Sequence, residues 1–104
     1  LIHSHVSYLP DDRFPSEFPY LSLSLIEWLA EKGTRLVGLD SPSVDAFDSK
    51  DLPCHHALRT HKMVNLETLC LKDVPDGEYE LLALPLKLDE VCGSPVRAVL
   101  RTLG

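Results

Sequence analysis

Three of the chain's five histidines lie in one short stretch that ends in a carboxylate. The histidines are His55, His56 and His61, and Glu67 follows within an apolar run. A charged side chain in apolar surroundings is costly to bury unless it is paired. Because imidazole and carboxylate groups are ordinary zinc ligands, this stretch predicts half of a metal site.

The spacing of these residues limits how many can face one ion. Residues 52–61 read as a helix of two to three turns, on which His55 and His56 point in different directions and His61 lies on neither histidine's face. Residues 62–69 read as an extended segment, so Glu67 must return toward the helix to share a metal with a histidine. The alternative is that His55 and Glu67 form a hydrogen-bonded structural pair without a metal.

Two further histidines lie near the N-terminus. Residues 1–6 alternate apolar and polar side chains, which predicts a half-buried strand with His3 and His5 on one face. Two histidines so placed could bind a metal together. A polar solvent face is the favoured interpretation, because no carboxylate or third histidine is near in sequence.

Two serines follow a predicted buried strand. The apolar run at residues 35–39 leads into Asp40-Ser-Pro-Ser-Val-Asp45, and open α/β sheets commonly hold ligands at the carboxyl ends of their strands. Ser41 and Ser43 are therefore candidate substrate-binding residues. A turn in which Asp and Ser side chains bond to backbone amides is an equally good interpretation. The chain has no G-x-S-x-G, so a serine-hydrolase elbow is not indicated.

The remaining elements alternate helix and strand. Ser22 or Ser24 caps a predicted helix that Gly33 ends. A long strand, expected to be central in its sheet, covers residues 78–88, and a final strand covers residues 96–101. This alternation predicts the α/β class.

Size and composition narrow the possible classes of protein. A chain of 104 residues with 44% hydrophobic content predicts a single domain over residues 1–104. The net charge of −6 and the dispersed basic residues argue against a nucleic-acid partner. Three cysteines without C-x-x-C spacing indicate a reducing compartment, and no run approaches the roughly 20 apolar residues of a membrane span. We expect a cytoplasmic protein and, since the chain opens on Leu1 without methionine, a fragment.

Four ordered segments carry a resemblance to a known family. They are Leu-Val-Gly-Leu-Asp-Ser-Pro-Ser-Val-Asp (36–45), Asp-Ser-Lys-Asp-Leu-Pro-Cys-His (48–55), Val-Asn-Leu-Glu-Thr-Leu (64–69) and the stretch from Gly-Glu-Tyr-Glu-Leu-Leu-Ala to Val-Arg-Ala-Val-Leu-Arg (77–101). In this order they resemble the C-terminal half of the cyclase family of metal-dependent hydrolases, of the kynurenine formamidase type. The resemblance implies a mixed sheet with flanking helices, as part of a swivelling β/β/α cyclase-type fold.

The resemblance also implies an activity and its ligands. Enzymes of this family use zinc, or manganese, to activate water against an amide or lactam carbonyl, here the linear amide N-formylkynurenine, which gives kynurenine and formate. His55 and Glu67, twelve positions apart, match two metal ligands of the family. The motif H-x-x-x-H-x-D-x-P-x-H, which supplies the other ligands and a catalytic histidine, has no match here, and His3 and His5 do not fit its spacing. No catalytic residue is therefore assigned within this chain.

Two alternatives to this function stay open. The chain could be a non-catalytic interaction module that keeps the cyclase fold, or part of a hydrolase for another amide or lactam. Strands that lack their neighbours leave open edges and exposed apolar surface. We therefore expect a homo-oligomer, or pairing with a chain that supplies the missing half.

Overall fold

The computed structural model describes residues 1–104, which divide into two compact units, Leu1–Asp73 and Val74–Gly104. The prediction of one domain over the whole chain stays a prediction. No helix is both long and apolar enough to cross a membrane. In chain order the elements are η1 (His5–Tyr8), α1 (Leu23–Glu31), β1 (Leu36–Gly38), α2 (Pro53–Thr60), β2 (Val64–Leu66), β3 (Tyr79–Leu82) and β4 (Val99–Thr102).

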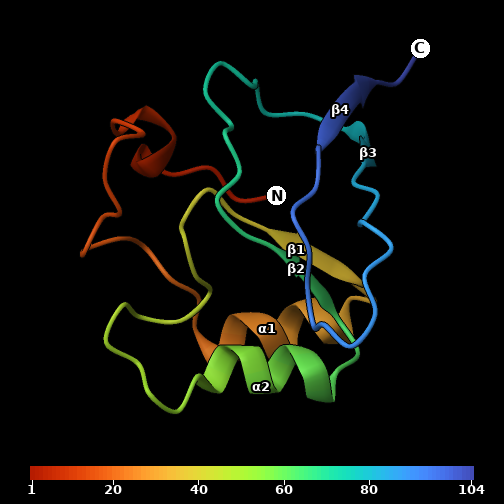
Figure 1. Ribbon diagram of the computed structural model, residues 1–104. Helices are drawn as coiled ribbons and strands as arrows, with labels where there is room; N and C mark the ends of the chain where they lie inside the picture. The colour runs from red at the N-terminus through yellow and green to blue at the C-terminus, as the bar shows by residue number, and fades with distance from the viewer. The chain divides into compact units, whose positions relative to one another are not determined.

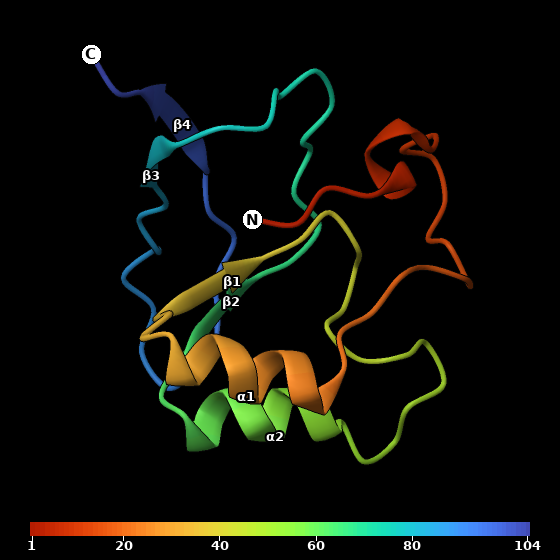
Figure 2. The ribbon, with the colours of Figure 1, turned by 180° about the vertical axis from the view of Figure 1, so that it is seen from behind.

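The first unit is built on a parallel strand pair covered by helices. Strands β1 and β2 pair in parallel, with Leu36 opposite Val64 and Gly38 opposite Leu66. Both helices lie on the same side of this pair and run in the same direction (Figures 1 and 2). The buried core between these elements consists of Leu21, Ile26, Val37, Leu39, Val44, Cys54, Leu58 and Met63. The predicted α/β class is confirmed, with the parallel and antiparallel pairings in two separate sheets.

Helix α1 begins and ends where the sequence predicts. The Ser22 Oγ accepts a hydrogen bond from the amide of Leu25 at 3.2 Å, which satisfies one of the amides left free at a helix start. Ile26 is fully buried, whereas Glu27 is exposed. Gly33 adopts a φ of 81°, the left-handed conformation that glycine tolerates after a helix.

Helix α2 depends on a cap from outside its own sequence. Leu52 at the N-cap makes no side-chain hydrogen bond, and Pro53 has no amide hydrogen. Instead, Asp45 Oδ1 accepts from the amide of Cys54 at 2.8 Å, and Asp45 Oδ2 accepts from the amide of His55 at 3.1 Å. A carboxylate eight residues upstream therefore fixes the start of the helix.

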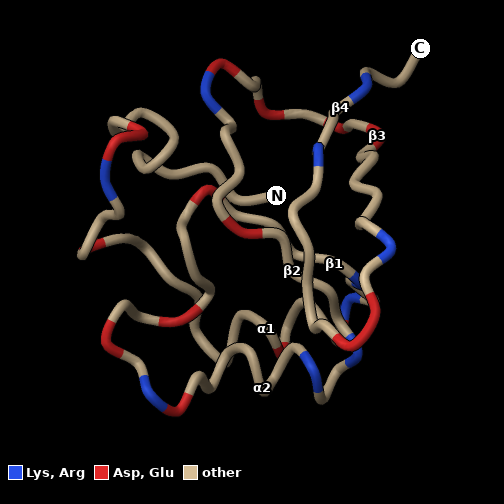
Figure 3. Tube along the Cα trace, in the orientation of Figure 1, with Lys and Arg blue, Asp and Glu red and all other residues tan.

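Positive charge lies at the C-terminal ends of both helices. Figure 3 shows Lys and Arg at the C-terminal ends of both α1 and α2. Lys32 is the C-terminal cap of α1, and Arg59 lies in the last turn of α2. Positive charge in these positions complements the helix dipole.

The prediction of a strand over residues 1–6 is wrong. Ile2 alone pairs, in an isolated parallel bridge with Leu39, and the chain then turns into η1. Asp40 holds this turn, since its side chain accepts from the amides and hydroxyls of Ser4 and Ser7 at 2.7–3.1 Å. Such side-chain bonds compete with the ladder bonds of a strand, which explains the difference.

The second unit is an antiparallel pair with much exposed apolar surface. Tyr79 pairs with Thr102, and Leu82 with Val99. The prediction of a long central strand over residues 78–88 is wrong, because pairing ends at Leu82, and the final strand covers 99–102 instead of 96–101. Beyond β3, the amide of Leu86 bonds to Ser94 Oγ instead of joining a ladder. The side chains of Leu82, Leu84, Leu86 and Leu88 are exposed, from 42% to 80%.

Two buried carboxylates make the fold less stable at acid pH. Burial disfavours the charge of Asp40 and Asp45, but their hydrogen bonds, from Ser7 and Ser4 to Asp40 and from Cys54 and His55 to Asp45, outweigh burial and lower the pKa of both. Because each pKa is lower in the folded than in the unfolded chain, their contribution is complete above about pH 5. It shrinks as the pH falls below the ordinary value of 3.8 and is lost below the folded pKa.

We therefore expect Asp40→Asn to lower the free energy of unfolding at pH 7 by about 2 kcal/mol, since the amide group cannot accept all four hydrogen bonds. The variant should also lose less stability than the wild type between pH 5 and acid pH. Urea unfolding at several pH values measures both effects. Asp12→Asn, at an exposed carboxylate, is the control and should change stability by less than about 0.5 kcal/mol. Equal pH profiles for Asp40→Asn and wild type would contradict the role of Asp40.

Candidate metal centre

His55 and Glu67 meet at the carboxyl end of the parallel strand pair. His55 lies in the first turn of α2, and Glu67 directly follows β2. The loop that follows β1 is tied to the same edge, because the amide of Leu69 bonds to the carbonyl of Leu39 at 3.1 Å and that of Thr68 to the carbonyl of Ser41 at 2.9 Å. Parallel pairing therefore brings the β1 loop, the start of α2 and the end of β2 together.

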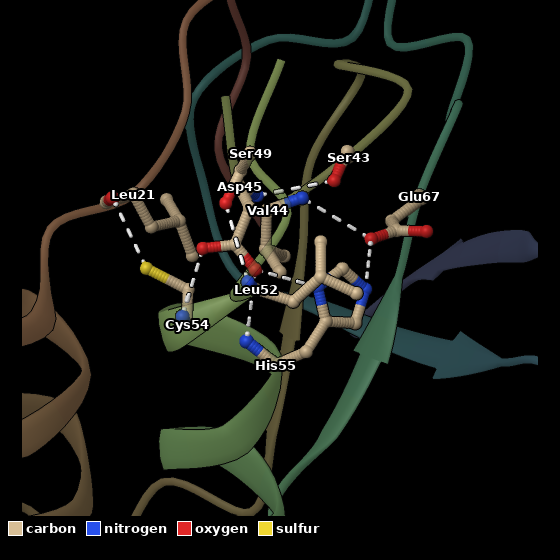
Figure 4. Close-up of polar contacts among 9 residues, drawn as sticks. All are labelled: Leu21, Ser43, Val44, Asp45, Ser49, Leu52, Cys54, His55 and Glu67. Carbon is tan, nitrogen blue, oxygen red and sulfur yellow. Dashed lines mark hydrogen bonds and ion pairs between the residues drawn. The ribbon is translucent and has the colours of Figure 1, made fainter. Parts of the chain in front are cut away.

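The imidazole of His55 lies between two carboxylates (Figure 4). His55 Nε2 is 3.2 Å from Glu67 Oε1, and His55 Nδ1 is 2.7 Å from Asp45 Oδ2. Glu67 Oε1 also accepts from the amide of Val44 at 3.1 Å. The side chains of His55 and Glu67 are 35% and 27% exposed, whereas that of Asp45 is 2% exposed. Glu67 thus returns in space to the helix, as sharing a metal requires.

An imidazole between two carboxylates is stabilised by a positive charge, either on the ring or beside it. A carboxylate only accepts hydrogen bonds, and a neutral imidazole has a single N–H. His55 can therefore satisfy only one of its two carboxylate neighbours while it is neutral. The other contact joins two acceptors unless the ring is protonated or a cation lies beside Nε2 and Oε1. The donor set of one imidazole nitrogen and one carboxylate oxygen is suited to zinc or manganese.

The other histidines lie away from this contact. His56 is exposed on α2, and His61 caps the C-terminal end of that helix. His3 is exposed and stacks on Tyr8, with 5.6 Å between ring centroids, and His5 is exposed in η1. No group of three or more His, Cys, Asp or Glu side chains is arranged to hold a metal ion. The metal-ligand roles of His55 and Glu67 stay predictions.

The two candidate serines have different surroundings. Ser43 Oγ accepts from the amide of Asp45 at 3.1 Å, as in the turn interpretation. Ser41 is 1% exposed, and its hydroxyl has no hydrogen-bond partner. A cavity of about 340 Å³ lies nearby, and Asp40, Pro42 and Thr68 are among its lining residues. Substrate binding by Ser41 and Ser43 remains a prediction.

Asp45 is not among the residues that the sequence pattern predicts for the site, although the sequence contains a signal for it. A helix that begins Leu-Pro-Cys-His carries no capping side chain of its own, so its first amides need an acceptor from elsewhere in the chain. Cys54, beside Asp45, is not a candidate nucleophile. Burial and then the neighbouring Asp45 raise the pKa of its thiol to about 11, and its Sγ donates to the carbonyl of Leu21.

Comparison with known proteins supports the resemblance. No protein-family model matches the chain. It is 50% identical over 91 residues to a kynurenine formamidase of Bacillus cytotoxicus, an alignment that covers 88% of this chain and 44% of that protein. It is 49% identical over 92 residues to the kynurenine formamidase of Bacillus anthracis, with the same coverage.

Solved structures agree with these relatives. A potential metal-dependent hydrolase with cyclase activity superposes with a TM-score of 0.80 at 34% identity and covers 91% of this chain and 46% of that one. A predicted metal-dependent hydrolase from Bacillus stearothermophilus superposes with a TM-score of 0.80 at 33% identity, covering 92% and 45%. The chain thus spans less than half the length of the proteins that it matches. Over the part that it spans, the chain is similar in sequence to these kynurenine formamidases and similar in structure to these metal-dependent hydrolases.

Proposed function

We propose that the chain is part of a metal-dependent hydrolase that cleaves a small linear amide, of the type of N-formylkynurenine, into an amine and formate. The observation that carries the proposal is the distance of 3.2 Å between His55 Nε2 and Glu67 Oε1, which lets one cation contact both atoms. The relatives named kynurenine formamidase support the substrate class.

In this proposal His55 and Glu67 hold the ion, and zinc or manganese fits their donor set. Such an ion, when bound, supplies Lewis-acid activation of a carbonyl and of water. Catalytic zinc sites usually have three protein ligands, so two residues bind weakly on their own. The remaining ligand and a proton-transferring histidine then come from polypeptide that this chain does not span.

The first test is metal binding by the chain itself. In equilibrium dialysis against zinc, His55→Ala and Glu67→Gln should each bind much less zinc than the wild type, because each removes one of two ligands. Inductively coupled plasma analysis measures the bound zinc. His56→Ala is the matched control, since His56 lies on the same helix but is exposed. Equal zinc content in all four proteins would refute the ligand assignment.

The second test is hydrolysis. The chain is co-expressed with a polypeptide covering the part of the Bacillus anthracis enzyme that it does not match, and the purified complex is assayed with N-formylkynurenine. We expect formation of kynurenine, and a loss in kcat/KM of at least about 100-fold in His55→Ala but not in His56→Ala. A zinc-loaded complex that cleaves another amide or a lactam, but not N-formylkynurenine, would contradict the substrate and leave the reaction class standing.

A second candidate role, binding of another polypeptide, is favoured by the second unit. A two-stranded sheet is marginal alone, and its leucines are exposed. We propose that this surface, defined by Leu82, Leu84, Leu86 and Leu88, associates with a second copy or with a polypeptide that completes the enzyme.

Size-exclusion chromatography with light scattering tests this association. The wild type should elute as a dimer or larger species, and Leu84→Lys with Leu86→Lys should shift it toward the monomer. Leu23→Lys, at an exposed leucine of α1, should not. A compact wild-type monomer at micromolar concentration that also fails to bind the completing polypeptide would rule out the interface.

A further inference from the structure

Asp45 is a buried carboxylate whose bonds all converge on the start of α2. It is 2% exposed, its Oδ1 accepts from the Cys54 amide, and its Oδ2 faces both the amide and the Nδ1 of His55. Capping alone would need only the two backbone amides. The additional contact of 2.7 Å with the imidazole indicates a second role.

The geometry determines which nitrogen of His55 carries the proton in the neutral ring. The contact of Nδ1 with Asp45 is shorter than that of Nε2 with Glu67, 2.7 against 3.2 Å. Asp45 is closed off from water, whereas the side chain of Glu67 is 27% exposed. With the proton on Nε2, the lone pairs of Nδ1 and of the buried Asp45 Oδ2 would face each other at 2.7 Å, so the single proton belongs on Nδ1, directed at Asp45. The lone pair of Nε2 then points toward Glu67.

The residue beside Asp45 orients the second candidate ligand. The amide of Val44 donates to Glu67 Oε1 at 3.1 Å. The side chain of Val44 is fully buried in the core, and Ser43 Oγ accepts from the Asp45 amide. Two consecutive residues, both anchored, therefore contact both His55 and Glu67.

We propose that the Val44–Asp45 dipeptide is the positioning element of the metal site. The Asp45 side chain selects the Nδ1–H tautomer of His55, and the Val44 amide orients Glu67, so that Nε2 and Oε1 face one cation. This inference rests on the proposed function for the identity of the ligands. Carboxylates behind metal-bound histidines typically change metal affinity by about 10–100-fold when they are removed.

The tautomer can be measured without any metal. A long-range 1H–15N correlation spectrum of the metal-free chain, at a pH at which the ring is neutral, distinguishes Nδ1–H from Nε2–H. The His55 signal is assigned by its absence in His55→Gln. We expect the Nδ1–H form in the wild type and a shift toward Nε2–H in Asp45→Asn, whose side-chain NH2 can face Nδ1. This wild-type spectrum decides the tautomer even if the variant does not fold.

The affinity for zinc is the second readout. Isothermal titration with zinc should show affinity about 10–100-fold weaker in Asp45→Asn than in the wild type. Asp40→Asn is the matched control, because it makes the same change at another carboxylate that is 2% exposed but does not contact His55. Its affinity should equal that of the wild type, although its stability falls.

The outcomes separate this inference from the proposed function. An Nε2–H tautomer in the wild type, or equal zinc affinity in Asp45→Asn and wild type, would overturn the role of Asp45. If no protein binds zinc, the proposed metal site fails, and the tautomer spectra alone decide: Nδ1–H that shifts in Asp45→Asn supports the positioning role, and any other pattern overturns it.

Discussion

The contact on which the site depends is the carboxylate of Asp45 against the first turn of α2. Without it, two amides of that turn would have no partner, because Leu52 and Pro53 supply no cap. The same carboxylate fixes the ring of His55. One side chain therefore sets both the start of α2 and the position of the His55 ring, so a change there affects the fold and the candidate site together.

The parallel pairing of β1 and β2 is the second constraint. It places the end of each strand at one edge of the sheet, where the loop after β1 and Glu67 after β2 come within hydrogen-bond distance. Asp40 belongs to the same loop and ties the N-terminal segment through Ser4 and Ser7. Two aspartates of one loop thus hold the neighbouring segments in place. Asp40 bonds to the segment around η1, and Asp45 bonds to the start of α2.

The sequence predicts the two helices well, because most of the residues that define them lie within or next to each helix. The cap at Ser22, the buried Ile26 and the glycine at position 33 define α1 without reference to the rest of the chain. The helix that the sequence predicts over residues 52–61 is close to the observed Pro53–Thr60. Residue types and spacing point to the stretch that holds His55 and Glu67, and helix geometry with the family resemblance narrows it to these two. Their proximity depends on the parallel pairing of β1 and β2.

The wrong strand predictions share a physical cause, because the structure of these segments depends on bonding partners that are distant in sequence. The alternating pattern at residues 1–6 gives way to bonds from Ser4 and Ser7 to Asp40, more than thirty positions away. Alternation at residues 78–88 predicts a strand, but a strand needs a neighbour, and pairing ends at Leu82. The role of Asp45 depends on its contact with the uncapped start of α2, which the spacing of the residues alone does not reveal.

The external cap of α2 also bears on how the histidine-rich segment could be used outside this protein. A helix of eight residues is too short to form alone in water, and this one lacks a capping side chain of its own. A peptide with the sequence of residues 52–67 would therefore carry the right donor atoms without their geometry. The proximity of His55 to Glu67 is a property of the folded unit and cannot be transferred as a linear motif.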